Sequence, residues 1–289
     1  MTSKEQYKVI STLGKFSISL PVGFSAYLGF VVATQGFGIN GLYIFLGIFL
    51  LSSAASLLNQ IQEQQIDVKM DRTCGRPLPK AQITNLQAIS IGFVFFTLGC
   101  LFLYLVNLPA LFWGIMGLVW YNFIYTPLKR ITAFSVFPGA IVGAIPPIAG
   151  WVGGGGDLLN DKLFLLAFFF FIGQMPHFWL LVIKYGNQYS KAGLPSLTNI
   201  FSVDQIMRIN SVWLWASFVS ALFFTVSKLI QSQAISIILI ITTIAMMIWA
   251  LKITFFDSRE NEKKIRPMFI YFNSYYLWVM MLFLLDVIV

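Results

Sequence analysis

Four side chains that carry an amide or a carboxylate recur at every fourth position of the segment 59–71. They are Asn59, Glu63, Asp67 and Asp71. On a helix, side chains at i and i+4 lie on one face about 6 Å apart, so the spacing predicts a stripe of one amide and three carboxylates. Such oxygens are suitable ligands for Mg²⁺, which typically also binds substrate phosphates. The stripe predicts a metal site, although a solvated helix end would show the same spacing.

Two arginines follow the stripe. Arg72 and Arg76 are again four residues apart, and arginine is suited to bidentate contacts with phosphate. We expect the helix to end at 76–79, Arg-Pro-Leu-Pro, because proline removes a backbone donor and clashes with the preceding turn. The stripe and the arginines together indicate a site for Mg²⁺ and a diphosphate at a membrane surface.

Membrane helices must position these residues. The chain has 289 residues, of which 58% are hydrophobic and 10% are charged. Soluble domains carry about 25% charged residues, so the composition excludes a water-soluble fold, and it also excludes disorder. Nine stretches approach the roughly 20 apolar residues that a spanning helix needs, which predicts an all-α integral membrane bundle of nine transmembrane helices, in a single membrane domain over 1–289. The expected spans are 15–34, 41–59, 87–106, 109–126, 132–152, 162–183, 211–229, 234–251 and 268–288.

The net charge of +8 is explained by topology and requires no nucleic acid as a partner. With nine spans, every basic residue except Lys162 and Lys228 falls on the side of the N-terminus. The positive-inside rule then puts the N-terminus in the cytoplasm and the C-terminus outside. We therefore expect a multi-pass protein of the cell inner (plasma) membrane whose active site faces the cytoplasm. The charged segment 257–264 indicates a solvated loop.

One histidine and two cysteines limit the chemistry further. A single histidine rules out a multi-histidine metal site within one chain. Two cysteines cannot form a disulfide framework. The oxygen stripe therefore remains the main candidate for a metal site.

The stripe and the segment after it resemble the first motif of the UbiA-type intramembrane prenyltransferases. These enzymes transfer a prenyl group from an allylic diphosphate to an aromatic or other acceptor. They have nine transmembrane helices, with the first motif after helix two and a second acidic motif after helix six. The matching residues are Asn59, Glu63, Asp67, Arg72, Thr73, Arg76, Pro77, Leu78 and Pro79.

Further segments are similar to the protoheme IX farnesyltransferase branch of that family, which makes haem O. They are 125–130, 137–151, 176–179, Tyr189 and 192–195. The resemblance implies Mg²⁺-dependent farnesyl transfer from farnesyl diphosphate to a vinyl group of haem B. One alternative is the same chemistry on another aromatic acceptor, such as a quinone precursor. Another is a degenerate, non-catalytic paralogue that binds haem or prenyl lipid. An unrelated transporter would leave the stripe followed by Arg-Pro-Leu-Pro unexplained.

The resemblance also implies roles for individual residues. Asp67, Lys129 and Arg130 are the expected catalytic residues, and the expected metal ligands are Asn59, Glu63 and Asp67. The residues expected to bind the diphosphate are Asn59, Asp71, Arg72, Arg76, Lys129, Arg130 and Lys184. The residues expected at the acceptor or prenyl pocket are Tyr125, His177 and Tyr189. Structural alternatives remain: Lys129 and Arg130 as positive-inside anchors, and His177 as a hydrogen-bonded interhelical histidine.

The chain departs from the family pattern at both motifs. Glu63 stands where the family usually has aspartate, and Gln65 where the haem branch often has another acid. Asn187 and Gln188 precede Tyr189 at positions where the haem branch normally has acids. They offer carbonyl oxygens without charge, so a second Mg²⁺ would be weakly held or absent. The nearby lysines, Lys184 and Lys191, could supply positive charge instead.

Overall fold

The computed structural model describes residues 2–256 and 261–289. Within these ranges all regular secondary structure is helical, and nine helical segments are long and apolar enough to cross a membrane. The prediction of an all-α fold with nine spans is confirmed. Residues 257–260, which belong to the expected solvated loop, lie outside the described residues.

The chain divides into two compact units, each described by itself. Helix α8 (Val136–Gly153) and helix α9 (Asp161–Lys191) contribute residues to both. The first unit comprises Met1–Thr132, Ile145–Gly156 and Gln188–Pro195. The second comprises Ala133–Ala144, Asp157–Asn187 and Ser196–Val289. The single membrane domain over 1–289 expected from the sequence stays a prediction.

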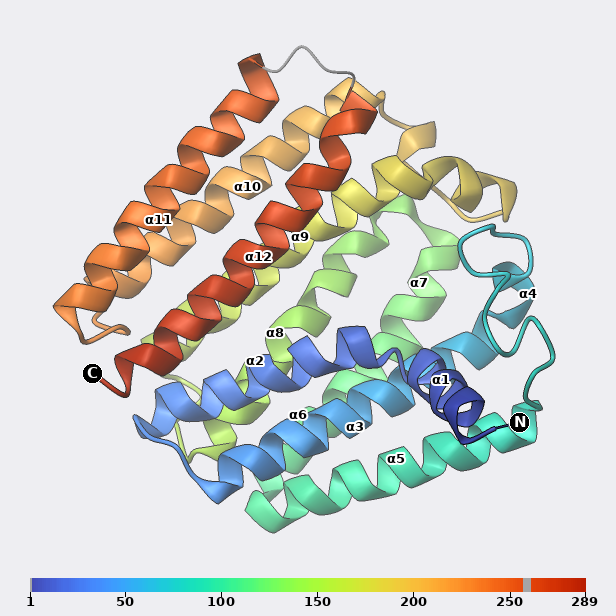
Figure 1. Cartoon of the computed structure of the whole chain (residues 1–289), viewed down its shortest axis with the longest axis horizontal. Coiled ribbons are helices and arrows are strands. Elements are labelled where there is room, and N and C mark those ends of the chain that lie inside the picture. Colours follow the sequence, from blue (N-terminus) through green and yellow to red (C-terminus); the bar gives the residue numbers. More distant parts are fainter. Residues whose placement is uncertain (1, 257–260) are drawn as a thin grey trace. The chain divides into compact units, whose positions relative to one another are not determined.

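Helix α3 is the centre of the first unit. It packs against α2, α5 and α6, and Figure 1 shows α2 and α5 on either side of it. Asn107 forms a tight turn between α5 (Asn85–Val106) and α6 (Leu108–Val119), and its Oδ1 accepts the N–H of Ala110 at 2.8 Å and caps α6. Besides the parts of α8 and α9, the elements of this unit are α1 (Ser3–Leu13), α2 (Phe16–Thr34), α3 (Ile39–Gln62), α4 (Gln64–Asp67), α5 (Asn85–Val106), α6 (Leu108–Val119), η1 (Trp120–Tyr125) and α7 (Thr126–Ile131).

Two glycines let α8 approach α2 closely within the first unit. A Cβ atom on Gly150 would lie 1.7 Å from the main-chain oxygen of Ala26. A Cβ atom on Gly29 would lie 2.1 Å from the main-chain oxygen of Pro147. Small residues serve the same purpose in membrane helix pairs whose backbones pack directly. This contact fixes α2, and with it the start of the chain, against the rest of the unit.

The second unit is built around α10, which packs against α11 and α12. Its core is aromatic. The ring of Phe169 stacks on that of Tyr276 with centroids 4.2 Å apart, and Phe224 lies 5.1 Å from Phe169. Besides the parts of α8 and α9, its elements are η2 (Ala133–Ser135), η3 (Leu197–Asn199), α10 (Val203–Val226), α11 (Gln233–Leu251), η4 (Lys252–Phe256) and α12 (Asn261–Asp286).

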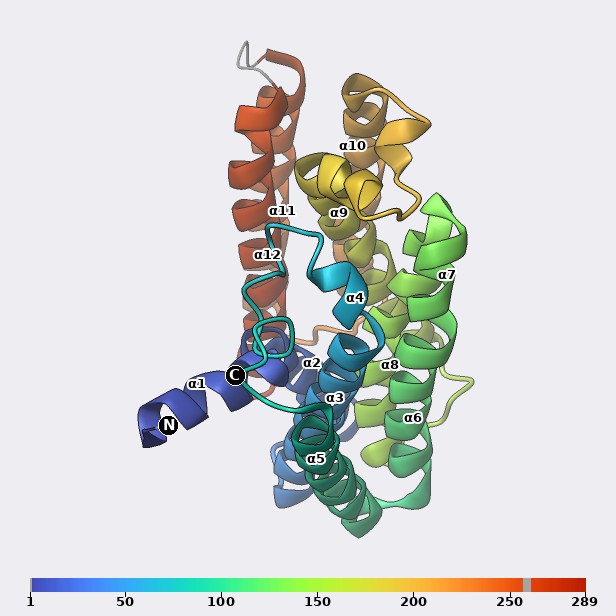
Figure 2. The same ribbon diagram turned by 90° about the vertical axis from the view of Figure 1, so that its right-hand side faces the viewer.

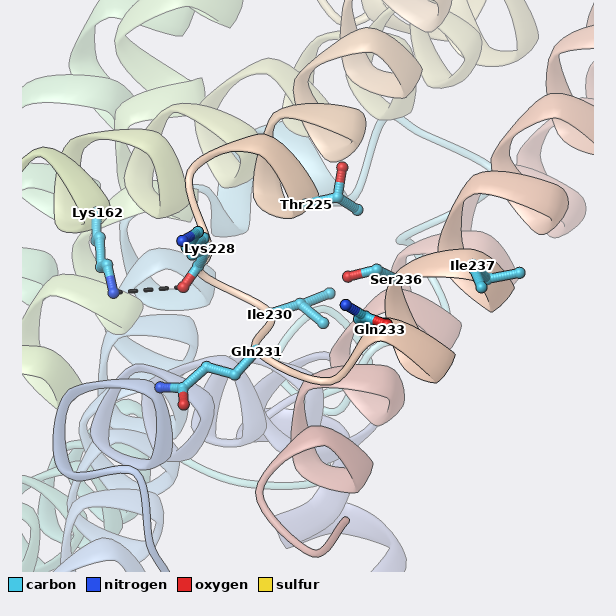
Figure 3. A pocket seen from close by; sticks show the side chains of 8 residues that line it. All are labelled: Lys162, Thr225, Lys228, Ile230, Gln231, Gln233, Ser236 and Ile237. Carbon is cyan, nitrogen blue, oxygen red and sulfur yellow. Dashed lines mark hydrogen bonds between the residues drawn. The ribbon is translucent and has the colours of Figure 1, made fainter.

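An open groove of about 820 Å³ lies at the turn between α10 and α11. Lys162 and Lys228 line it together with polar side chains such as Thr225, Gln231 and Ser236 (Figure 3). Lys162 Nζ donates to the main-chain oxygen of Lys228 at 3.3 Å. Lys162 and Lys228, the two basic residues expected on the side opposite the N-terminus, therefore lie close together.

The seventh span begins earlier than predicted, at Val203 instead of residue 211. Ser202 starts the helix with a capping box, in which its hydroxyl accepts the N–H of Gln205 and the Gln205 side chain accepts the N–H of Ser202. Hydropathy places the start at the first apolar run and so misses the polar first turns. Helix α9 likewise continues beyond the predicted end at residue 183 to Lys191.

Candidate active site

Three of the four stripe residues lie at the end of α3 and in the short helix α4. Asn59 is in the last turn of α3, Glu63 follows its end, and Asp67 is the last residue of α4. Their exposed fractions are only 1%, 8% and 3%. Buried polar and charged groups require partners. A solvated helix end therefore does not describe these three residues.

The spacing predicts a helix that continues to Arg76, but the helix ends earlier. The backbone leaves helical geometry at Glu63, with φ −102° and ψ 8°, and helix α4 ends at Asp67. The Thr73 hydroxyl donates to the main-chain oxygen of Asp67 at 2.9 Å and satisfies a carbonyl at the helix end. Figure 2 shows the loop that follows α4. Asp71 is exposed in this loop, so it does not extend the buried stripe.

The amide of Asn59 is at the centre of a hydrogen-bond network. Its Nδ2 donates to Glu63 Oε2 at 2.9 Å and to Thr126 Oγ1 at 3.1 Å. Its Oδ1 accepts from Lys15 Nζ and from the Tyr121 hydroxyl, each at 3.3 Å. These four bonds fix the orientation of the amide, so that its carbonyl oxygen and the Glu63 carboxylate have defined positions.

A π-helical turn, η1, brings Tyr121 and Thr126 to this network. The Thr126 hydroxyl donates to the main-chain oxygen of Tyr121, five residues earlier, at 2.9 Å. Gln62 Nε2 at the end of α3 donates to the main-chain oxygen of Asn122 at 3.2 Å. Short π-helical segments inside α-helices are frequent at functional sites. Here the widened turn directs both side chains towards α3.

Both buried carboxylates of this cluster, Glu63 and Asp67, have a basic partner. Lys129 Nζ lies 2.6 Å from Glu63 Oε1, and Arg76 Nη1 lies 2.5 Å from Asp67 Oδ2. Burial alone would raise the pKa of Glu63, but the charge of Lys129 and the hydrogen bonds from Lys129 and Asn59 bring that pKa below its ordinary value. Glu63 is therefore ionised at neutral pH.

The loop after α4 meets the end of α9 within the first unit. The main-chain N–H of Arg72 donates to Gln188 Oε1 at 3.2 Å, and Arg72 Nη1 donates to the Tyr189 hydroxyl at 3.4 Å. Gln188 occupies a position where the haem branch normally has an acid. Its carbonyl oxygen therefore serves a backbone contact between the two motif segments.

Lys15, Tyr121 and Thr126 also belong to this cluster, although the sequence alone does not mark them as site residues. Lys15 precedes α2 and is half-buried. Loss of hydration and the positive charges of Arg76 and Lys129 lower the pKa of Lys15 to about 7, although Glu63 and Asp67 oppose the shift. Its place at the start of the first expected span, 15–34, favours a topological anchor and gives no indication of the contact with Asn59.

The structure brings the expected basic residues of α7 to the stripe. Besides the Lys129–Glu63 pair, Arg130 Nη2 donates to the main-chain oxygen of Gln62 at 2.5 Å. Lys129 Nζ also lies 5.0 Å from the ring centroid of Tyr125, within the range of a cation–π contact. These specific contacts favour a site role over plain anchoring at the membrane surface.

Two other expected site residues lie in the second unit. Lys184 is exposed, with its Nζ 5.2 Å from the ring centroid of Tyr185. His177 Nδ1 is 3.2 Å from Asn273 Oδ1, an oxygen that can only accept, so Nδ1 carries the proton in this bond. That contact matches the alternative of a hydrogen-bonded interhelical histidine. The expected roles of both residues at the diphosphate or acceptor stay predictions.

The donor set at the end of α3 fits a single Mg²⁺. Within residues 2–256 and 261–289, no group of three or more His, Cys, Asp or Glu side chains is placed so that it could hold a metal ion. Glu63 and Asp67 supply two carboxylates, and Asn59 supplies a carbonyl oxygen. Mg²⁺ is commonly bound by one or two carboxylates together with waters and substrate phosphates. The three residues therefore suit a metal that arrives with a diphosphate.

Comparison with known sequences finds a family model and relatives that match most of the chain. A profile of the UbiA prenyltransferase family matches residues 11–274. The protoheme IX farnesyltransferase of Oleidesulfovibrio alaskensis is 32% identical over 80% of this chain and 82% of its own. The enzyme of the same name from Flavobacterium psychrophilum is 27% identical over 98% of this chain and 95% of its own.

A solved structure shares the fold. A UbiA homologue from Archaeoglobus fulgidus, bound to GPP and Mg²⁺, superimposes with a TM-score of 0.70 over 97% of this chain and 99% of its own. The two sequences are 13% identical, so this likeness concerns the fold alone.

Proposed function

This chain belongs to the UbiA prenyltransferase family, and we propose that it transfers a farnesyl group from farnesyl diphosphate to a vinyl group of haem B, giving haem O. Its family and the nine apolar helices among the described residues make it an integral, multi-pass membrane prenyltransferase. The names of its curated relatives support haem B and farnesyl diphosphate as the substrates. A membrane site suits both molecules, since each is apolar with an anionic end.

The buried cluster at the end of α3 is the observation that carries this proposal. Asn59, Glu63 and Asp67 would hold Mg²⁺, which when bound supplies positive charge that stabilises the leaving diphosphate. The GPP and Mg²⁺ bound by the Archaeoglobus fulgidus homologue support this choice of metal and substrate class. With Asn187 and Gln188 in place of acids, one metal ion would be held firmly and a second weakly or not at all.

The basic residues around the cluster would neutralise the diphosphate as it leaves. Lys129 and Arg76 lie within 2.6 Å of the carboxylates, and positive charges held in a site of this kind stabilise the negative charge that develops in a transition state. Asp67, Lys129 and Arg130 would act directly on the reacting group. The wider diphosphate-binding set would also include Asp71, Arg72 and Lys184.

The reaction balances without a further co-reactant except water. The C1–O bond of farnesyl diphosphate breaks, and the diphosphate leaves with the electron pair. The vinyl π electrons form a bond to farnesyl C1, and the resulting cation beside the porphyrin takes up water and loses a proton. Tyr125, Tyr189 and His177 would line the acceptor or prenyl pocket, where aromatic faces can stabilise an allylic cation.

We also propose the topology. The N-terminus would be cytoplasmic, the C-terminus outside and the active site on the cytoplasmic side of the inner (plasma) membrane, in a single membrane domain over 1–289. The distribution of basic residues supports this orientation. Cysteine accessibility tests it: a cysteine placed at Lys8 should be protected from an impermeant reagent in intact cells, and one at Lys228 should react.

An acceptor panel tests the chemistry. Purified protein in detergent is given farnesyl diphosphate, Mg²⁺ and either haem B, an aromatic acid or a naphthoate, and release of inorganic diphosphate is measured. We expect release with haem B that is abolished by a chelator. Release only with another acceptor would replace haem B by a quinone precursor. Binding of haem B without release under any condition would contradict enzymatic function.

A further inference from the structure

The ammonium group of Lys15 lies against an oxygen atom that the proposed function assigns to the metal. Its Nζ is 3.3 Å from Asn59 Oδ1. Lys15 comes from the turn between α1 and α2, whereas Asn59 is on α3, 44 residues further along the chain. The contact is therefore a tertiary one, and the mechanism proposed above makes no use of it.

The backbone at Lys15 is in the left-handed region, with φ 45° and ψ 51°. This conformation is unfavourable for a residue with a Cβ atom, and glycine or asparagine would adopt it more readily. Strained residues of this kind persist where the surrounding structure over-determines them, and they cluster at functional sites. The presence of lysine here points to a use for its side chain.

Helix α3 itself holds this turn in place. Gln60, the neighbour of Asn59, donates from Nε2 to the main-chain oxygens of Thr12 at 3.2 Å and Leu13 at 2.7 Å. The Ser19 hydroxyl donates to the main-chain oxygen of Gly14 at 3.0 Å. The same turn of α3 therefore presents the Asn59 amide and fixes the segment that delivers an ammonium group to it.

The two carboxylates of the cluster are also paired with basic side chains. Lys129 Nζ lies 2.6 Å from Glu63 Oε1, and Arg76 Nη1 lies 2.5 Å from Asp67 Oδ2. Both basic residues belong to the proposed diphosphate-binding set. Because Lys15 donates to Asn59 Oδ1, each of the three candidate metal ligands has an oxygen atom in contact with a basic side chain.

We propose that Lys15 is a displaceable counter-ion of this site, which holds Asn59 Oδ1 in the unloaded protein and binds the diphosphate of the prenyl substrate in the loaded protein. The inference rests on the proposed function, since it takes Asn59 as a metal ligand and a prenyl diphosphate as the substrate. An ammonium group and a metal ion repel each other and compete for one amide oxygen. Lysine has a flexible four-carbon stem and is a common phosphate ligand, so it can leave the amide for the diphosphate.

If this exchange occurs, neutralising Lys15 should raise the affinity for the metal ion and lower the affinity for diphosphate. The full-length protein in detergent is titrated with Mn²⁺, followed by electron paramagnetic resonance, first alone and then with inorganic diphosphate. Lys15→Met should bind Mn²⁺ alone roughly tenfold more tightly, because a competitor is removed, and should bind diphosphate roughly tenfold more weakly; each factor of ten corresponds to about 1.4 kcal/mol. Lys15→Arg should behave like the wild type. Lys8→Met, an exposed site on α1, is the matched control and should change neither affinity.

Reductive methylation of the wild type tests the same exchange without a variant. The methylation rate of Lys15, measured by mass spectrometry, should rise when Mn²⁺ is added and fall when diphosphate is added to the Mn²⁺-loaded protein. The rate at Lys8 should stay constant. An unchanged rate at Lys15 in both steps would overturn the proposal.

The variant Asp67→Asn separates this inference from the proposed function. If Asp67→Asn binds Mn²⁺ as tightly as the wild type, the metal site itself is wrong and the role of Lys15 falls with it. If Asp67→Asn loses Mn²⁺ but Lys15→Met binds neither Mn²⁺ more tightly nor diphosphate more weakly, only the role of Lys15 is wrong.

Discussion

Replacing Asp67 by asparagine should reduce activity far more than stability. The Asp67 carboxylate lies 2.5 Å from Arg76 Nη1, and the exposed fractions of the two side chains are 4% and 17%. Asparagine keeps the shape of the side chain and one acceptor oxygen, but it removes the negative charge. The substitution therefore tests the charge of the site rather than its packing.

The expected loss of stability lies between two limits. An exposed ion pair contributes up to about 1 kcal/mol, and breaking a fully buried one costs about 3–5 kcal/mol. Because the asparagine oxygen can still accept a hydrogen bond from Arg76, we expect a loss of about 1.5–3 kcal/mol, the contribution of a hydrogen bond to a charged group. The loss of turnover should be about a hundredfold or more, as for other groups that stabilise transition-state charge.

Thermal unfolding in detergent and the initial rate of prenyl transfer measure the two effects. Asp71→Asn is the matched control for stability, since it makes the same chemical change at an exposed position of the same loop. It should leave the unfolding temperature unchanged and cost less activity. Wild-type turnover by a folded Asp67→Asn protein would refute the assignment of Asp67, and so would equal losses of activity in the two variants.

Three further predictions follow from individual contacts. Glu63 has a folded pKa below its ordinary value of 4.5, so its ionised form stabilises the protein above about pH 4.5, and this contribution is lost as the pH falls through the folded pKa. Glu63→Gln should remove that part of the acid destabilisation. If Glu63→Gln leaves the profile of unfolding temperature against pH unchanged, that result would contradict the Glu63–Lys129 pair. Gly150→Ala should destabilise the protein by about 1–3 kcal/mol through overpacking, whereas Gly75→Ala, where a Cβ meets nothing within 4 Å, should have little effect on the unfolding temperature. Asn210 is buried, and both its amide atoms lack a hydrogen-bond partner among the described residues, so Asn210→Leu should raise stability by about 1 kcal/mol; a lower unfolding temperature would indicate a partner for the amide.

Local features of the sequence predict much of the fold and part of the site. Apolar length gives the nine spans, and the spacing of Asn59, Glu63 and Asp67 gives the buried cluster, because each depends on residues close together in the chain. The same spacing misleads at Asp71, where the chain has already left the helix. The start of α10 is missed for a related reason, since hydropathy does not detect the capping box at Ser202.

The remaining site residues depend on contacts between distant segments. Thr126 is 67 residues from Asn59, and Lys15 is 44 residues away. No local pattern marks the π-helical turn that directs Tyr121 to the cluster, or the left-handed backbone conformation of Lys15. Such contacts become predictable only once the packing of α3 against its neighbours is known. The roles of His177 and Lys184 stay predictions.

The most direct test of the account is the mass of the product that purified protein makes from haem B, farnesyl diphosphate and Mg²⁺ in ¹⁸O-labelled water. We predict a haem bearing one added farnesyl group and one hydroxyl group whose oxygen is ¹⁸O, absent with chelator and absent in a folded Asp67→Asn variant. Unchanged haem B from folded, metal-loaded wild-type protein would contradict farnesyl transfer to haem at this site.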